Sequence, residues 1–486
     1  MILAASGMVA WLALTGKVQA QSSDALIDKL VDKGILTVKE ANDLRDETDK
    51  NFNSAYSVKS GMPDWVSSFK INGDMRGRYE GFYYPDNDLA TVDRNRWRYR
   101  ARLGFTANIN DNFEVGLRLS SGEPGTGGVG GDPISSNTTM TSNGSRKFVY
   151  LDLAYGKWTP VQNSIWSAST TVGKMENPFV YSDMVFDGDY TPEGLAEQIS
   201  WNLCEQHVLK FNLGGFVINE LQGYSTDTYL SGAQIRLDSK WNKKLSTSSG
   251  IGVLALNRVQ DLQTGDVAAV APTVLNPTGT PAKSGVPDQN RGNERETILA
   301  GPVGAKYVVN STTSTAPIYN FNPITADIST TYLLESFPIY TGAFPVKVFA
   351  DYMMNPAAQQ GDQAYQVGVT FGKSGKKGTW DISYRWKYLE SNAWYEELVD
   401  SDFGAFYQVG TRDPALKAFS NNPSSANNLG YSAGTNVKGH ILKWSYSPYD
   451  ALTLGVTYYL TDLITTAPNT GKSEVGRLQV DAVLKF

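Results

Sequence analysis

From residue 68 onward, apolar and polar residues alternate along the chain with a period of two, which is the pattern of β-strands with two different faces. Between Ser68 and Glu80, the positions alternate between apolar residues or glycine and polar or charged residues. The stretch from Arg94 to Ile109 repeats the pattern, with apolar side chains opposite a row of arginines. Both stretches exceed the ~5–6 residues that are usual in soluble sheets and reach the ~9–11 residues that cross a bilayer at a tilt. The pattern therefore favours strands that cross a membrane.

The same alternation predicts sixteen strands along the chain. They lie near 69–80, 94–109, 112–121, 147–156, 164–174, 195–203, 207–218, 230–240, 246–257, 324–336, 344–354, 364–373, 377–389, 437–447, 450–461 and 475–486. The connections between them alternate between short and long, and the long ones are 81–93, 121–146, 175–194, 219–229, 258–323, 390–436 and 462–474. Short turns at one end and long loops at the other are typical of outer-membrane barrels, in which the long loops are extracellular.

The predicted fold class is therefore all-β. We expect a transmembrane antiparallel barrel of about 16 strands over residues 68–486. Eighteen strands are possible, because Glu296–Asn310 could form another hairpin. An even number of strands returns the C-terminus to the periplasmic side, where the first strand begins.

The first 67 residues follow other patterns. Residues 1–20 are apolar and end in Val18-Gln19-Ala20, which predicts a signal peptide, although a retained membrane anchor is the alternative. Residues 21–67 are predicted to be a periplasmic helical segment and linker, because Leu26, Leu30 and other apolar residues recur at a spacing of three to four. This segment could be an amphipathic helix on its own chain or a short coiled coil between subunits.

Composition excludes several classes of function. Lys and Arg total 43 against 49 Asp and Glu, so the net charge of −6 argues against binding of nucleic acid. One cysteine, Cys204, and two histidines, His207 and His440, leave little for a metal cluster, a haem or disulfides, so no metal site and no cofactor are predicted. A barrel enzyme would depend on His440 with Ser445 or Ser447, but no nucleophile motif surrounds them, so no catalytic residue is predicted.

The inward faces of the predicted strands carry many charges. Unpaired charge is very costly in a dry interior, whereas barrels of 16–18 strands enclose an aqueous channel. We therefore predict passive diffusion of small hydrophilic solutes and ions across the bacterial outer membrane, with membrane lipid and lipopolysaccharide as neighbours.

Two charged features are expected to line and narrow the channel. The first is a basic stripe on the first three strands, formed by Arg76, Arg78, Arg94, Arg96, Arg98, Arg100, Arg102 and Arg118. The second is the third long loop, 175–194, which carries Glu176, Asp183, Asp187, Asp189 and Glu193. If this loop folds inward, acidic groups face basic groups across the channel and create a transverse field. Alternatively, the arginines pair with neighbouring carboxylates such as Asp74 and Glu80, or with lipopolysaccharide phosphates at the rim.

Three motifs resemble a known family of bacterial outer-membrane channels, the "putative porin" family. They are the segment Leu26–Thr37, the stretch Gly173-Lys174-Met175-Glu176-Asn177-Pro178-Phe179, and the segment Asp187–Gly194. The last strand, which ends in Phe486, also resembles the terminal strand of bacterial porins. The resemblance implies a sixteen-stranded, trimeric porin with an inward third loop. Related phosphate-selective porins have an arginine-lined lumen, so a preference for anions or phosphate is the alternative function.

Two readings from other classes also remain open. The barrel could be a structural sleeve for an electron-transfer partner. The long loops 258–323 and 390–436, rich in Pro, Gly, Asn and Thr, could make it a surface adhesin, although we expect them to cap the mouth or contact neighbouring subunits.

Overall fold

The computed structural model describes the residues that form the barrel. These are 63, 65–86, 93–110, 112–124, 130–220, 227–259, 291–294, 317–408, 428–466 and 472–486. The predicted signal peptide, the predicted helical segment and the possible hairpin Glu296–Asn310 lie outside the described residues. The chain divides into two units, Met1–Lys70 and Ile71–Phe486, and the barrel lies in the second apart from the start of its first strand.

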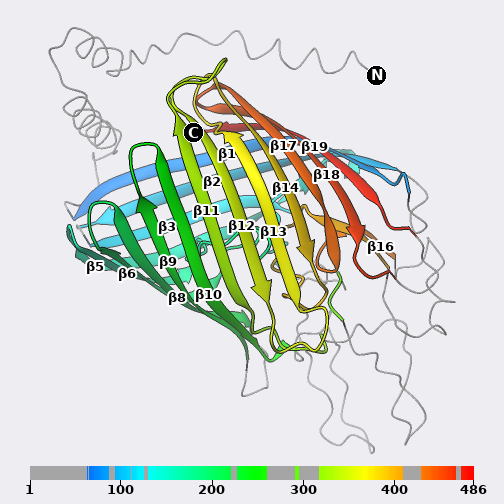
Figure 1. Cartoon of the computed structure of the whole chain (residues 1–486), viewed down its shortest axis with the longest axis horizontal. Coiled ribbons are helices and arrows are strands. Elements are labelled where there is room, and N and C mark those ends of the chain that lie inside the picture. Colours follow the sequence, from blue (N-terminus) through cyan, green and yellow to red (C-terminus); the bar gives the residue numbers. More distant parts are fainter. Residues whose placement is uncertain are drawn as a thin grey trace, which may run out of the picture. The chain divides into compact units, whose positions relative to one another are not determined.

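Sixteen strands form the barrel wall. They are β1 (Val66–Tyr83), β2 (Arg94–Ile109), β3 (Phe113–Gly122), β5 (Phe148–Gln162), β6 (Trp166–Lys174), β7 (Glu193–Asn202), β8 (His207–Asn219), β9 (Thr228–Lys240), β10 (Leu245–Asn257), β11 (Ile324–Leu334), β12 (Phe344–Met354), β13 (Gln363–Gly372), β14 (Thr379–Leu389), β17 (Val437–Tyr449), β18 (Leu452–Leu463) and β19 (Val475–Lys485). Each pairs with its neighbours, and β1 pairs with both β2 and β19, so the sheet closes (Figure 1). The fold prediction is confirmed, with sixteen strands in the closed wall.

Within the described parts of the connections lie three short strands and one short helix. Strand β4 (Thr138–Thr139) pairs with β2 from within the connection between β3 and β5, which also contains the 3-10 helix η3 (Ser142–Gly144). Strands β15 (Gly404–Gln408) and β16 (Asn428–Ala433) form a separate hairpin in the connection between β14 and β17. Among the described residues, no helix has the length and apolar character needed to span a membrane.

The seam between the first and last strands closes the ring antiparallel, from Asp74 opposite Lys485 to Tyr83 opposite Gly476. At its end, the main chains of Gly73 and Phe486 exchange two hydrogen bonds, with N···O distances of 2.9 and 3.1 Å. A Cβ atom on residue 73 would collide with the carbonyl oxygen of Arg102 and the ring of Phe486. Glycine is therefore required for this close approach.

Exposure along β2 follows the predicted faces. On β2, Trp97 is 58% exposed whereas the adjacent Arg98 is only 7% exposed, so the apolar side chains point outward and the arginines inward. Aromatic pairs stand beside the short turns, among them Phe113 with Trp158 and Trp166 with Trp201, whose ring centroids are 6.4 and 4.8 Å apart. Such aromatic belts mark the membrane interface of outer-membrane barrels.

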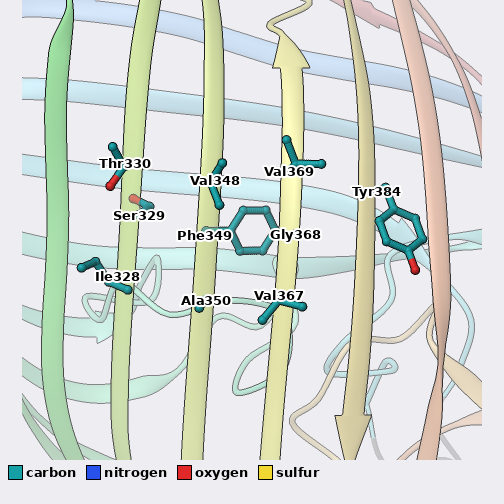
Figure 2. Close-up of a pocket in the computed structure, with 10 residues that line it drawn as sticks. All are labelled: Ile328, Ser329, Thr330, Val348, Phe349, Ala350, Val367, Gly368, Val369 and Tyr384. Atoms are coloured by element: carbon teal, nitrogen blue, oxygen red, sulfur yellow. The ribbon is translucent and has the colours of Figure 1, made fainter.

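The outer face of β11–β14 is hollowed into an apolar groove of about 430 Å³. The small side chain of Ala350 lies in the groove among the branched side chains of Ile328, Val348 and Val367. Tyr384 of β14 borders the groove (Figure 2). The groove lies on the face that is expected to contact lipid or another subunit.

Candidate functional site

Strands β19, β1 and β2 present a dense network of ion pairs on their inward face. Arg78 is buried between Asp481 and Asp402, with N···O distances of 2.7 and 3.0 Å. Arg100 is paired with Asp74 at 2.8 Å. Glu80 is fully buried, because Arg477 reaches it at 2.6 Å and Arg96 also contacts it. Charges in these positions are tolerated because nearly every one has a partner of opposite sign.

The connection between β6 and β7, residues 175–192, reaches this basic face with its acidic side chains. Asp189 accepts hydrogen bonds from Arg100 and Arg102, both at 3.2 Å. Glu176 contacts Arg118, which is also paired with Asp152. Glu193, the first residue of β7, pairs with Lys174 at 3.0 Å. The arginines therefore bind both the neighbouring wall carboxylates and this connection, which we call the β6–β7 segment.

The β6–β7 segment also contacts two strands elsewhere in the ring. Asp183 is paired with Arg385 at 2.5 Å and with Lys387 at 2.8 Å, both on β14. The main chain of Val180 exchanges hydrogen bonds with Gln234 and accepts one from Arg236, both on β9. Around the closed sheet, β9 is six strands from β2, β14 is five strands from β9, and β2 is five strands from β14. One connection thus contacts the inward face at three well-spaced places.

A second connection packs against the first. Residues 390–403, which we call the β14–β15 segment, contain the buried Trp394, whose ring meets that of Phe186 edge to face at 5.9 Å. The indole N–H of Trp394 donates to the carbonyl of Val185 at 2.7 Å, and the N–H of Asp187 donates to Leu398 at 2.8 Å. The two segments therefore form one apolar core, which also includes Phe179, Met184, Tyr190 and Val399.

The β14–β15 segment adds two carboxylates to the charged network. Asp400 accepts a hydrogen bond from Lys387 at 3.1 Å, and Asp402 accepts bonds from Arg78 and Arg477. Sequence reasoning missed these two residues because it placed 390–436 among the outer loops. A signal was present, however, since Trp394 and Tyr395 are followed by four acidic residues, much as aromatic and acidic residues are combined in the β6–β7 segment.

The carboxyl groups of the two segments have different proton affinities. Burial raises the pKa of Asp183, but the charges of Arg385 and Lys387 outweigh it and leave the pKa below the usual range. Burial also raises the pKa of Asp402, but the positive charges of Arg78 and Arg477 outweigh this effect. The pKa of Asp402 therefore lies well below its usual value. Asp187 forms no ion pair with any described residue. Burial, with the negative charges of Asp189 and Asp400, raises the pKa of Asp187 well above its usual range.

The remaining predicted residues have other surroundings. Arg76 donates to the side chain of Asn137 at 2.6 Å, and Arg98 donates to the main-chain oxygen of Asn137 at 3.1 Å. Arg94 is exposed, with its guanidinium 6.0 Å from the ring of Phe82.

The two histidine–serine pairs that were considered for catalysis do not form. His440 points outward, where its Nδ1 lies 2.8 Å from the hydroxyl of Tyr384, whereas Ser445 and Ser447 are buried on the other face of β17. Within the described ranges, no group of three or more His, Cys, Asp or Glu side chains could hold a metal ion.

Comparison with known proteins identifies one family. The model of a family described as "Putative porin" matches residues 88–411. Among curated proteins, none matches the chain in sequence.

Solved structures with a similar fold include three outer-membrane proteins. OprB of Pseudomonas putida at high pH is 10% identical, with 86% of this chain and 94% of that chain covered and a TM-score of 0.47. OmpF of Salmonella typhi, in a complex with daunomycin, is 10% identical, with 87% and 98% covered and a TM-score of 0.43. The outer-membrane channel DcaP of Acinetobacter baumannii is 12% identical, with 86% and 97% covered and a TM-score of 0.40.

Proposed function

Because this chain belongs to the putative porin family of outer-membrane diffusion channels, we propose that its two internal acidic segments narrow the water path to a constriction. The β6–β7 segment forms this constriction, and the β14–β15 segment packs against it. The arginines Arg76, Arg78, Arg94, Arg96, Arg98, Arg100, Arg102 and Arg118 form one wall. Of the acidic residues, Glu176 and Asp189 face that wall. Asp183 is bound on β14, Asp187 contacts the β14–β15 segment, and Glu193 pairs with Lys174.

The observation that carries the proposal is the three-point attachment of the β6–β7 segment. A connection that stayed at the rim could contact adjacent strands, but it could not reach inward-facing side chains on β2, β9 and β14 together. A connection attached in this way crosses the barrel and leaves only part of its cross-section to water. The solutes that pass are therefore small and hydrophilic.

Charge is nearly balanced at the proposed constriction. Since most of the arginines are neutralised by carboxylates of the wall or of the two segments, bulk ion selectivity should be modest. The field at the arginine wall itself still favours anions, and this preference should weaken as salt shortens the Debye length from ~10 Å at 0.1 M to ~3 Å at 1 M.

Planar-bilayer recording tests the proposed function. Purified mature protein, starting at Gln21, should give ohmic current steps, and its reversal potential in a salt gradient should be small. Heat-modifiable mobility on gels identifies a well-folded barrel. If such a barrel gives no conductance, the proposed channel function is refuted. As a control, removal of residues 24–50 should leave the single-channel conductance unchanged, because the proposed constriction lies entirely within the barrel.

We also propose that the protein assembles as a homotrimer surrounded by outer-membrane lipid and lipopolysaccharide. The apolar outer face, including the groove on β11–β14, offers surface that a neighbouring subunit could cover (Figure 2). Native mass measurement in mild detergent should give three copies per particle, and only monomer under these conditions would contradict the proposal. Removal of residues 24–50 is expected to weaken this assembly without closing the channel.

A further inference from the structure

Two neighbouring arginines of the inward face, Arg76 and Arg98, are less closely compensated by carboxylates than Arg78 and Arg100 are. Among the described residues, no carboxylate oxygen lies within 4.0 Å of the Arg76 guanidinium. The carboxylates nearest Arg98, those of Glu80 and Glu123, are 3.9 and 3.8 Å away. By contrast, Arg78 and Arg100 have carboxylate oxygens at 2.7 and 2.8 Å. Positive charge is therefore in excess where Arg76 and Arg98 lie.

The same two side chains carry unused hydrogen-bond donors. Within the described part of the chain, the Nε atoms of Arg76 and Arg98 are buried and have no hydrogen-bond partner, and Arg98 as a whole is only 7% exposed. Their terminal nitrogens reach two oxygens of a single residue, Asn137. The guanidinium groups are thus close together, and each presents an unsatisfied N–H. A buried donor on a charged group is costly when it is left unpaired, so the arrangement calls for an acceptor.

We propose that Arg76 and Arg98 form a binding subsite for an oxyanion group, a carboxylate or a phosphate, carried by a solute that passes through the channel. A water molecule could accept the two Nε–H bonds but would leave the excess charge uncompensated. An oxyanion supplies several acceptor lone pairs and a negative charge at once, and guanidinium groups bind it in a planar, charge-assisted geometry.

The connection between β3 and β5 supplies the opposite side of the subsite. Asn137 is buried, and its amide group donates to Ser135 at 3.3 Å. The adjacent Ser136 donates to Asp189 of the β6–β7 segment at 3.2 Å. The residue next to the one that holds both arginines is therefore bound to the proposed constriction. The inference rests on the proposed function only in that the subsite borders the path of the solute.

Binding to the purified full-length protein tests the subsite independently of conduction. Inorganic phosphate and acetate are titrated in separate experiments at low ionic strength, with chloride at the same ionic strength as the reference. Calorimetry gives the affinity for each anion. The midpoint temperature of thermal unfolding gives the stabilisation, since a ligand that binds only the folded state raises this temperature. We expect phosphate, acetate or both to bind more tightly than chloride, and the tighter binder identifies the group.

Substitution distinguishes the subsite from the general field of the arginine wall. Arg76→Gln and Arg98→Gln should each weaken binding about tenfold or more, because each removes a charge-assisted bond. The matched control is Arg118→Gln, which removes the same charge from an arginine already paired with Asp152 and Glu176. Without added oxyanion, Arg76→Gln should melt no lower than the wild type, since the buried charge that it removes has no ion pair among the described residues.

Two results would overturn the subsite. One is wild-type protein that binds neither phosphate nor acetate better than chloride, and the other is an Arg118→Gln variant that loses as much affinity as Arg76→Gln. Failure of the proposed function gives a different result. A protein that binds oxyanions but conducts no current would contradict the channel function and still support the subsite.

Discussion

The wall of β19, β1 and β2 and the wall of β11–β13 both carry charges on the inward face, but their surroundings differ. On the first wall, Glu80 and Arg477 are almost completely buried because the internal segments and neighbouring arginines cover them. On the second wall, Lys347 is exposed, and its ammonium group lies 5.6 Å from the ring of Phe349. The β6–β7 segment reaches the first wall through Asp189, and none of its ion pairs among the described residues falls on β11, β12 or β13.

This difference separates two uses of an inward charge. A covered charge such as Arg78 holds an internal segment in place, so its loss should change the shape of the path. An uncovered charge such as Lys347 meets the solution directly, so its loss should change the field without changing the shape. The following predictions test this distinction, beginning with the largest expected effect.

Replacement of Arg96, Arg98 and Arg100 by Ser should have the largest effect on conduction. The triple variant removes Arg96 from Glu80, and Arg100 from Asp74 and Asp189. The attachment of the β6–β7 segment to β2 is then reduced to the pair of Asp189 with Arg102. Single-channel conductance should rise by about twofold or more, and the reversal potential should shift toward cations. If a heat-modifiable triple variant keeps both quantities unchanged, these arginines do not border the conducting path.

Asp183→Asn should have the largest effect on stability. It leaves Arg385 and the fully buried Lys387 without their shared carboxylate, and breaking a buried ion pair of this kind costs about 3 kcal/mol. The temperature at which the barrel loses its folded gel mobility should fall accordingly. The control is Glu193→Gln, because Glu193 is 65% exposed in its pair with Lys174 and should contribute less than about 1 kcal/mol. Equal effects of the two substitutions would contradict this assignment.

The contact between the two internal segments should respond to pH through Asp187. The pKa of Asp187 is raised in the folded protein, so the folded state binds this proton more tightly than the unfolded state. Its contribution to stability is therefore present at low pH and is lost as pH rises above the usual aspartate range through the raised pKa. Asp400, whose pKa is also raised by burial, acts in the same direction.

Thermal melting at pH 5 and pH 8 measures this dependence. The wild type should be more stable at pH 5 than at pH 8. Asp183 and Asp402 do not contribute to this difference, because their lowered pKa values keep them ionised at both pH values. Asp187→Asn should reduce the difference between the two pH values. A variant with the full wild-type difference would show that another group is responsible.

The smallest effect is expected from Lys347→Gln. Because Lys347 is exposed and has no ion pair among the described contacts, the substitution should shift the reversal potential slightly toward cations and leave conductance and melting temperature unchanged. Recording at 0.1 M and 1 M salt checks the cause, since a field effect should almost disappear at the higher concentration. A changed melting temperature would mean that this charge is structural after all.

Strand positions were highly predictable from sequence, because membrane and water impose opposite demands on alternate residues. Strands β2 and β12 have the predicted bounds, and even β10, which is rich in Ser, Thr and Gly, lies where its spacing placed it. Strand β5 extends to Gln162, beyond the predicted end at residue 156, because the turn after it is short.

The internal segments were less predictable, because their partners are distant in sequence. Asp183 meets Arg385 across a separation of 202 residues, and no local period signals such a pair. The acidic residues of 175–194 were recognised because they stood out against the basic stripe. Asp402 was missed because the hairpin β15–β16 lies in a stretch whose composition is typical of a surface loop.

The closing seam has a consequence for biogenesis. Arg78 contacts Asp481 across 403 positions of sequence, and the last hydrogen bonds of the sheet are those of Phe486 with Gly73. A nascent chain that lacks its final strand would therefore expose two long, unpaired edges, which are prone to pair with other chains. Because contacts this distant form slowly, closure should be the late step of insertion, and chaperones would have to protect both edges until the last residue has arrived.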